Sequence, residues 1–218
     1  MNSFLKSLLV FVLLAAAGFA EAPPDFAETK KNADAGKAYA QYNLGLMYAK
    51  GTGVPKDYVE AVKWYRKAAD QGDAKAQINL GYMYANGEGV PKDSAEAVRW
   101  YRKAADQGDA VAQGGLGQLY RIGTGVPRDD VEAVKWCRLA AEQGYARGQC
   151  DLGIMYYLGA GVPKDLVQAH VWWNIAGANG YEDAKKNLAN VEKEMTDSQK
   201  EKAMDLAREL FAKLPKGK

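Results

Sequence analysis

The chain has 218 residues, of which 29 are Lys or Arg and 27 are Asp or Glu, which gives a formal net charge of +2. This balance indicates neither a nucleic acid nor an anionic membrane as partner, because both attract proteins through a marked excess of basic side chains. Basic and acidic residues also alternate along much of the chain, a pattern typical of solvated helix faces.

The N-terminal segment is typical of a secretory signal peptide. Lys6 precedes an apolar run from Leu8 to Ala17, and small residues follow as far as Ala22. The run is short for a membrane-spanning helix, although an uncleaved anchor is the alternative. We expect a signal peptide at 1–20, or cleavage after Ala22, and therefore a periplasmic or secreted protein with no stable membrane insertion after cleavage.

One motif occurs four times with a spacing of 36 residues. The copies are G-V-P-K-D at 53–57, 89–93 and 161–165, and G-V-P-R-D at 125–129. The surrounding residues repeat with the motif, and a fixed period of this length predicts a stacked array of similar units rather than one globular core.

Each period predicts two helices. The first runs from about Ala38 to Lys50 and ends at Gly51, a residue that can close a helix with positive φ. Asp57 then stands where an N-cap is expected, with its carboxylate able to accept hydrogen bonds from the free amides of the next turn. The second helix carries one apolar stripe, formed by Ala61, Trp64, Tyr65, Ala68 and Ala69.

Both ends of the array predict capping elements, which solenoids need because terminal repeats cannot bury both faces. The segment from Phe26 to Ala35 resembles a lone second helix, and 181–190 continues the register of the first helices. Thr196 and Gln199 form a capping box before a final amphipathic helix. The predicted divisions are a capping half-repeat at 21–36, repeats at 37–72, 73–108, 109–144 and 145–180, and a partial repeat with a capping helix at 181–218.

Together these residues resemble a known repeat. The pattern A-x-A-Q-x-x-L-G-x-M-Y, then G-x-G-V-P-K-D, then A-x-x-W-Y-x-K-A-A-x-x-G is similar to the Sel-one-like repeat (SLR), a relative of the tetratricopeptide repeat (TPR), over about residues 36–190. The resemblance implies an all-α, right-handed superhelical solenoid of antiparallel helix pairs that serves as a protein-interaction or assembly scaffold. Departures from the pattern, such as Cys137 and Trp173, gather in the third and fourth copies.

Positions that differ between the copies are candidates for function, because recurring positions are accounted for by packing. On the first helices the variable positions lie on one side of each helix. They are Tyr39, Asn43, Leu46 and Lys50; Lys75, Asn79, Tyr82 and Asn86; Val111, Gly115, Gln118 and Ile122; and Arg147, Asp151, Ile154 and Leu158. The first helix of such pairs generally lines the concave wall, so the stripe predicts a groove for a protein or peptide partner. The alternative is a merely solvated stripe.

Two cysteines lie nearly symmetrically about the predicted turn at 143–144. Cys137 belongs to a second helix and Cys150 to the first helix that follows it. Antiparallel neighbours at equal depth can approach bonding distance, so an oxidising compartment favours a disulfide. Two buried free thiols or a reactive site are the alternatives, although the C-x-x-C motif of redox catalysts is missing.

The sequence offers little for catalysis. Its only histidine, His170, lies in an apolar stretch of a second helix, where a core imidazole is favoured over a catalytic one. Beyond the leader, Ser94 and Ser198 stand outside the usual nucleophile motifs, and no His and Cys cluster has zinc spacing. The Gly- and Lys-containing loops lack a preceding strand and are better explained as helix caps than as phosphate loops. We therefore predict a non-enzymatic protein with no cofactor and no metal.

The resemblance leaves one alternative function. Some cysteine-rich secreted relatives of the repeat family are associated with β-lactams or peptidoglycan, so it implies a cell-wall ligand, bound or hydrolysed, as the alternative to a protein partner. This chain lacks the repeated cysteine pairs of those relatives.

Overall fold

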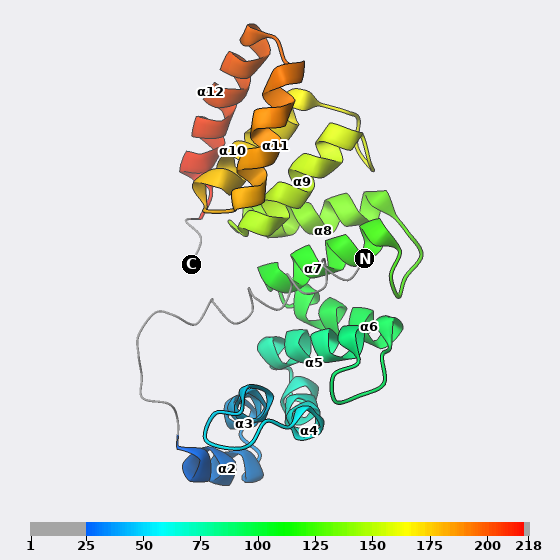
Figure 1. Ribbon diagram of the computed structural model, residues 1–218, viewed down its shortest axis with the longest axis vertical. Helices are drawn as coiled ribbons and strands as arrows, with labels where there is room; N and C mark the ends of the chain where they lie inside the picture. Colours follow the sequence, from blue (N-terminus) through cyan, green and yellow to red (C-terminus); the bar gives the residue numbers. More distant parts are fainter. Residues whose placement is uncertain (1–24, 216–218) are drawn as a thin grey trace. The chain divides into compact units, whose positions relative to one another are not determined.

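The computed structural model describes residues 25–215, so the predicted signal peptide lies outside the described residues. The described chain divides into two compact units, the first ending at Asp93 and the second beginning at Ser94. Both units are built from helices joined by short loops (Figure 1).

Unit 1 contains the N-terminal cap, one complete helix pair and the first helix of the next. Its helices are α2 (Phe26–Asp34), α3 (Ala38–Lys50), α4 (Tyr58–Asp70) and α5 (Ala74–Asn86). Each helix contacts the next one along the chain. The bounds confirm the predicted first helix at Ala38–Lys50 and the predicted lone capping helix, which ends one residue earlier than expected.

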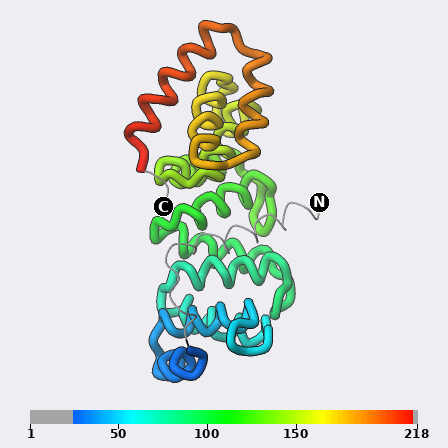
Figure 2. Tube along the Cα trace, turned by 60° about the vertical axis from the view of Figure 1, so that its left-hand side comes forward, coloured from blue at the N-terminus to red at the C-terminus, as the bar shows by residue number. Residues whose placement is uncertain are grey.

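Unit 2 contains two further helix pairs, a preceding second helix and the C-terminal cap. Its helices are α6 (Ser94–Asp106), α7 (Ala110–Ile122), α8 (Asp130–Glu142), α9 (Ala146–Leu158), α10 (Leu166–Ala178), α11 (Glu182–Val191), the 3₁₀ turn η1 (Glu192–Glu194) and α12 (Asp197–Lys213). At its end, α11 and α12 form a hairpin (orange and red in Figure 2), and both helices contact α10. A capping box between Thr196 and Gln199 starts α12, as the sequence predicts.

Helix ends follow the predicted signals. The carboxylate of Asp57 accepts hydrogen bonds from the backbone N–H groups of Val59 and Glu60 at 2.9 and 3.0 Å, and Asp129 caps α8 in the same way. Asp165 caps α10 through one hydrogen bond, from the backbone N–H of Gln168. Gly51 closes α3 with a φ of 73°, a left-handed conformation that a glycine adopts without steric cost. The repeated motif therefore acts as punctuation between helices.

The second glycine of the last three G-x-G loops has a further role that the sequence did not reveal. A Cβ atom added to Gly161 would lie 2.1 Å from the carbonyl oxygen of Asp130, the first residue of α8 in the preceding repeat. Gly89 meets the carbonyl oxygen of Tyr58 at 2.2 Å in the same manner. Only glycine allows this contact, which joins each of these three loops to the start of the second helix one repeat earlier.

Buried amides connect successive repeats. Gln41 is buried on α3 and donates a hydrogen bond to the carbonyl oxygen of Ala33 at 3.2 Å. Gln71, which follows α4, donates to Gln41 at 2.6 Å. In unit 2 the same bond joins Gln143 to Gln113 at 2.7 Å. Because buried polar groups need partners, these bonds help to fix how neighbouring pairs stack within each unit.

A helix that spans a membrane needs about 20 consecutive, mostly apolar residues. None of the helices between residues 25 and 215 is both long enough and apolar enough to cross a bilayer.

Candidate functional site

The predicted stripe on the first helices, termed here the variable face, is unevenly exposed. In unit 1, Tyr39, Lys50 and Lys75 are exposed, whereas the remaining members are half-buried or buried, namely Asn43, Leu46, Asn79, Tyr82 and Asn86. In unit 2, Ile122 and Leu158 are 52% and 61% exposed. The other unit 2 members are half-buried or buried, namely Val111, Gly115, Gln118, Arg147, Asp151 and Ile154.

Asn79 is part of the packing of unit 1. Its side chain is only 8% exposed and hydrogen-bonds with the phenols of Tyr42 and Tyr65. Burial is the main cause that raises the pKa of both phenols. Asn79 is therefore not among the members of the variable face that a partner can reach.

A polar cluster lies on the variable face of unit 2. One guanidinium nitrogen of Arg147 (Nη2) donates to Gln118 Oε1 at 2.8 Å and so links α9 to α7. Arg147 Nε lies 3.9 Å from Asp151 Oδ2, beyond hydrogen-bonding distance. Asp151 is 6% exposed and its Oδ2 has no hydrogen-bond partner. Burial raises the pKa of this carboxyl, while Arg147 and Arg121 oppose the shift.

The repeat register explains why Asp151 Oδ2 lacks a hydrogen-bond partner. Asp151 occupies the position of Asn79 two repeats later, and the two tyrosines that serve Asn79 correspond to Gly114 and Cys137. Neither Gly114 nor Cys137 offers a phenol. The ring of Tyr145 fills the space beside Gly114, where an added Cβ would lie 2.7 Å from Tyr145 Cε1. The position is therefore polar in both units but is satisfied by phenols only in unit 1.

The two cysteines are free in the structure, so the disulfide considered above is not formed. The Cys137 sulfur packs toward α7, because a Cβ added to Gly117 would lie 2.6 Å from it. The Cys150 sulfur lies 3.8 Å from the side-chain amide of Asn187 on α11. Equal depth about the turn suggested a bridge, but the two side chains point to different neighbouring helices.

Burial also determines the chemistry of these thiols. It raises the pKa of Cys137 far above the usual range and that of Cys150 to about 12. A thiol in this state carries almost no thiolate at neutral pH and is a poor nucleophile.

His170 lies in the core of unit 2. It is buried on α10, and its Nε2 lies 3.2 Å from Glu192 Oε1, while Nδ1 has no hydrogen-bond partner. Glu192 belongs to η1, so this contact connects the last repeat to the C-terminal cap. Among residues 25–215, no group of three or more His, Cys, Asp and Glu side chains could hold a metal ion.

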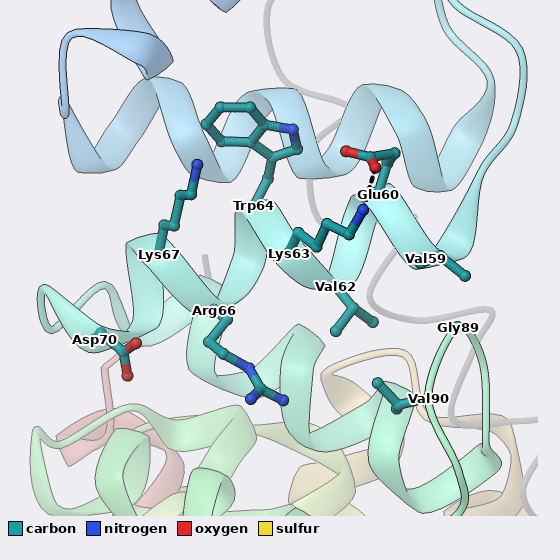
Figure 3. Close-up of a pocket in the computed structure, with 10 residues that line it drawn as sticks. All are labelled: Val59, Glu60, Val62, Lys63, Trp64, Arg66, Lys67, Asp70, Gly89 and Val90. Carbon is teal, nitrogen blue, oxygen red and sulfur yellow. Dashed lines mark hydrogen bonds and ion pairs between the residues drawn. The ribbon is translucent and has the colours of Figure 1, made fainter.

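A shallow cleft of about 500 Å³ lies in unit 1, away from the variable face, beside the second helix α4 and the loop at 89–90. In Figure 3, Val62 and Val90 face one another across it, while Trp64 and Lys67 point away. Several charged side chains around the cleft already interact with neighbouring residues. Lys63 pairs with Glu60 at 2.5 Å, and Lys67 Nζ lies 3.9 Å from the Trp64 ring centroid. The cleft was not predicted from the sequence, because most of its residues recur between copies and so resemble packing positions.

Comparison with known proteins identifies the repeat. The family model of the Sel1 repeat matches residues 38–73, 74–109, 110–145 and 146–181, one residue later than the predicted divisions. No curated protein matches the chain.

Solved structures give the same result. A protective antigen with an SLR fold from uropathogenic Escherichia coli strains is 36% identical, with a TM-score of 0.83. That match covers 96% of this chain but only 46% of the antigen, so this chain spans less than half of its length. A Sel1 repeat protein from Oxalobacter formigenes is 39% identical, with a TM-score of 0.71 over 82% of this chain and 74% of its own.

A more distant structure agrees in fold alone. An immunity protein from Pseudomonas aeruginosa is 21% identical, with a TM-score of 0.53 over 95% of this chain and 82% of its own.

The chain belongs to the Sel1 repeat family of helical solenoids, whose members generally mediate protein–protein interactions on a non-catalytic scaffold.

Proposed function

We propose that this protein is an exported interaction scaffold and that the variable face of its first helices binds a partner protein or peptide. The observation that carries the proposal is the exposure of two large apolar side chains, Ile122 and Leu158, at the same register position of α7 and α9. The two earlier copies have Lys50 and Asn86 there, so packing of the repeat does not require an apolar residue.

Such a pair fits a recognition surface better than a core. Burying an exposed Ile or Leu side chain against a partner contributes roughly 1.5–3 kcal/mol. Unit 1 by itself has Tyr39 on its first helix α3, an exposed aromatic of the kind enriched at interfaces. Helical grooves commonly bind extended or helical segments through a few such anchors.

The test compares two double variants in affinity capture of partners from a native extract. Ile122→Ser with Leu158→Ser alters the variable face, whereas Val59→Ser with Val131→Ser alters equally exposed apolar residues on the second helices. We expect the first variant to lose partners that the unaltered protein and the control retain, with circular dichroism unchanged in all three. Equal capture by both variants would contradict the assignment of the face.

Export is part of the same proposal and has its own test. The apolar run from Leu8 to Ala17 after Lys6 supports secretion to the periplasm or beyond. Expressed from Met1 in a bacterium, the protein should be recovered from the periplasm with a new N-terminus after Ala20 or Ala22. Recovery of the uncleaved chain in the cytoplasm would exclude the export proposal without affecting the binding proposal.

A further inference from the structure

Charge is distributed differently on the two kinds of helix. The first helices α3, α5, α7 and α9 carry four basic side chains, Lys50, Lys75, Arg121 and Arg147, against one acidic side chain, Asp151. The second helices α4, α6 and α8 carry both signs in similar numbers. The nearly neutral chain therefore has first helices of one predominant sign.

Asp151 offsets part of this charge, because its Oδ2 lies 3.9 Å from Arg147 Nε. It is 6% exposed, and its Oδ2 makes no hydrogen bond. The nearest cation, Arg147, lies 3.9 Å away and directs another nitrogen to Gln118 instead. Arg121 and Arg147 together still leave an excess of positive charge on α7 and α9.

In unit 2 the basic and apolar groups lie on adjoining helices. α7 and α9 contact one another, and Arg147 stands near the start of α9 while Leu158 is its last residue. Ile122 ends α7 at the same register position as Leu158. At 1.5 Å per helical residue, Arg147 and Leu158 are separated by about 16 Å along the axis.

We propose that the variable face of unit 2 binds an acidic peptide segment, with a carboxylate at Arg147 and an apolar side chain on Ile122 and Leu158. This inference rests on the proposed function and names the chemical class of the partner. An extended peptide advances about 3.3 Å per residue, so the acidic and apolar residues would stand about five positions apart.

Physical chemistry favours a carboxylate at this place. Arg147 is only 12% exposed in its side chain, and charges in a partly desolvated site attract more strongly than charges in open water. A guanidinium also offers paired donors that match the two oxygens of a carboxylate. Complementary charge would in addition speed association and suppress binding of basic segments.

The experiment is a selection from a random 12-residue peptide library displayed on phage, using the full chain. Three proteins are compared: the unaltered chain, Arg147→Gln with Asp151→Asn, and Arg99→Gln as control. The double variant removes the cation without leaving a buried carboxylate unpaired, and position 151 then carries the amide that α5 carries at Asn79. Arg99 has a side chain that is 75% exposed on the second helix α6.

We expect the unaltered chain and the control to enrich peptides with Asp or Glu about five positions from an apolar residue. A synthetic peptide of the enriched sequence should bind the double variant about tenfold more weakly, as loss of one charge-assisted contact predicts. Enriched peptides without acidic residues, or equal affinity for the double variant, would overturn this inference and leave the proposed function standing. If no peptide is enriched and the extract capture also fails, the proposed function itself is wrong.

Discussion

Units 1 and 2 have different side chains, with different surroundings, at the same position of the repeat. In unit 1, Asn79 is buried and hydrogen-bonds with Tyr42 and Tyr65. In unit 2, the corresponding Asp151 is buried beside Gly114 and Cys137, and one of its oxygens has no hydrogen-bond partner. The repeat frame therefore tolerates a change from a satisfied polar position to an unsatisfied charged one.

This difference separates residues that build the array from residues available for function. A buried carboxylate oxygen without a hydrogen-bond partner lowers stability, so it is not explained by packing alone. Functional sites are the places where proteins retain such unfavourable arrangements. In unit 2 this unfavourable arrangement lies beside Arg147, on the variable face.

The largest expected loss of stability concerns the contact between a loop glycine and a backbone carbonyl, which both units contain. Gly89→Ala in unit 1 and Gly161→Ala in unit 2 would each force a Cβ against a backbone carbonyl at 2.2 and 2.1 Å, and would also strain a left-handed backbone. We expect each to lower the free energy of unfolding by about 3 kcal/mol or more. Gly180→Ala, whose Cβ would meet nothing within 4 Å, should be milder. Equal melting temperatures for Gly161→Ala and Gly180→Ala would refute the loop contact.

A second pair of variants tests the charge difference between the units. Arg147→Ala would leave Asp151 buried without its nearest cation, and we expect a loss of roughly 2–4 kcal/mol at neutral pH. Lys75 occupies the same register in unit 1 but is exposed, so Lys75→Ala should change stability little. Chemical denaturation of both variants measures the difference. A similar loss in the two variants would mean that Asp151 does not depend on Arg147.

The difference in stability between Asp151→Asn and the unaltered chain should depend on pH. Because burial raises the folded-state pKa of Asp151 above its unfolded value, ionisation of this group opposes folding. The destabilisation should be absent below the unfolded pKa and should develop as the pH rises through the folded pKa. Asp151→Asn should therefore gain stability over the unaltered chain at neutral pH and lose that gain near pH 3. A difference that is constant with pH would contradict a raised pKa.

The sequence predicted the frame more fully than the site. Helix ends followed local signals such as Asp57, Gly51 and the Thr196 capping box, because caps depend on neighbouring residues alone. The state of Asn79 could not be predicted in this way. Its environment depends on residues of the preceding repeat, and variation between copies does not imply exposure. The choice between a disulfide and two free thiols could not be made from the sequence for a related reason, since helical depth fixes position along an axis but not side-chain direction.

The smallest effect should be found at the two thiols, which pack in the core of unit 2. Cys150, with its pKa raised to about 12, and Cys137, raised further, should react slowly with iodoacetamide while the protein is folded. After unfolding without reductant, mass spectrometry should find both alkylated, because the structure has two free thiols. Adding reductant before alkylation should change nothing. Two thiols that appear only after reduction would show a bridge in the exported protein, and α9 would then have to differ from the arrangement that places Cys150 beside Asn187.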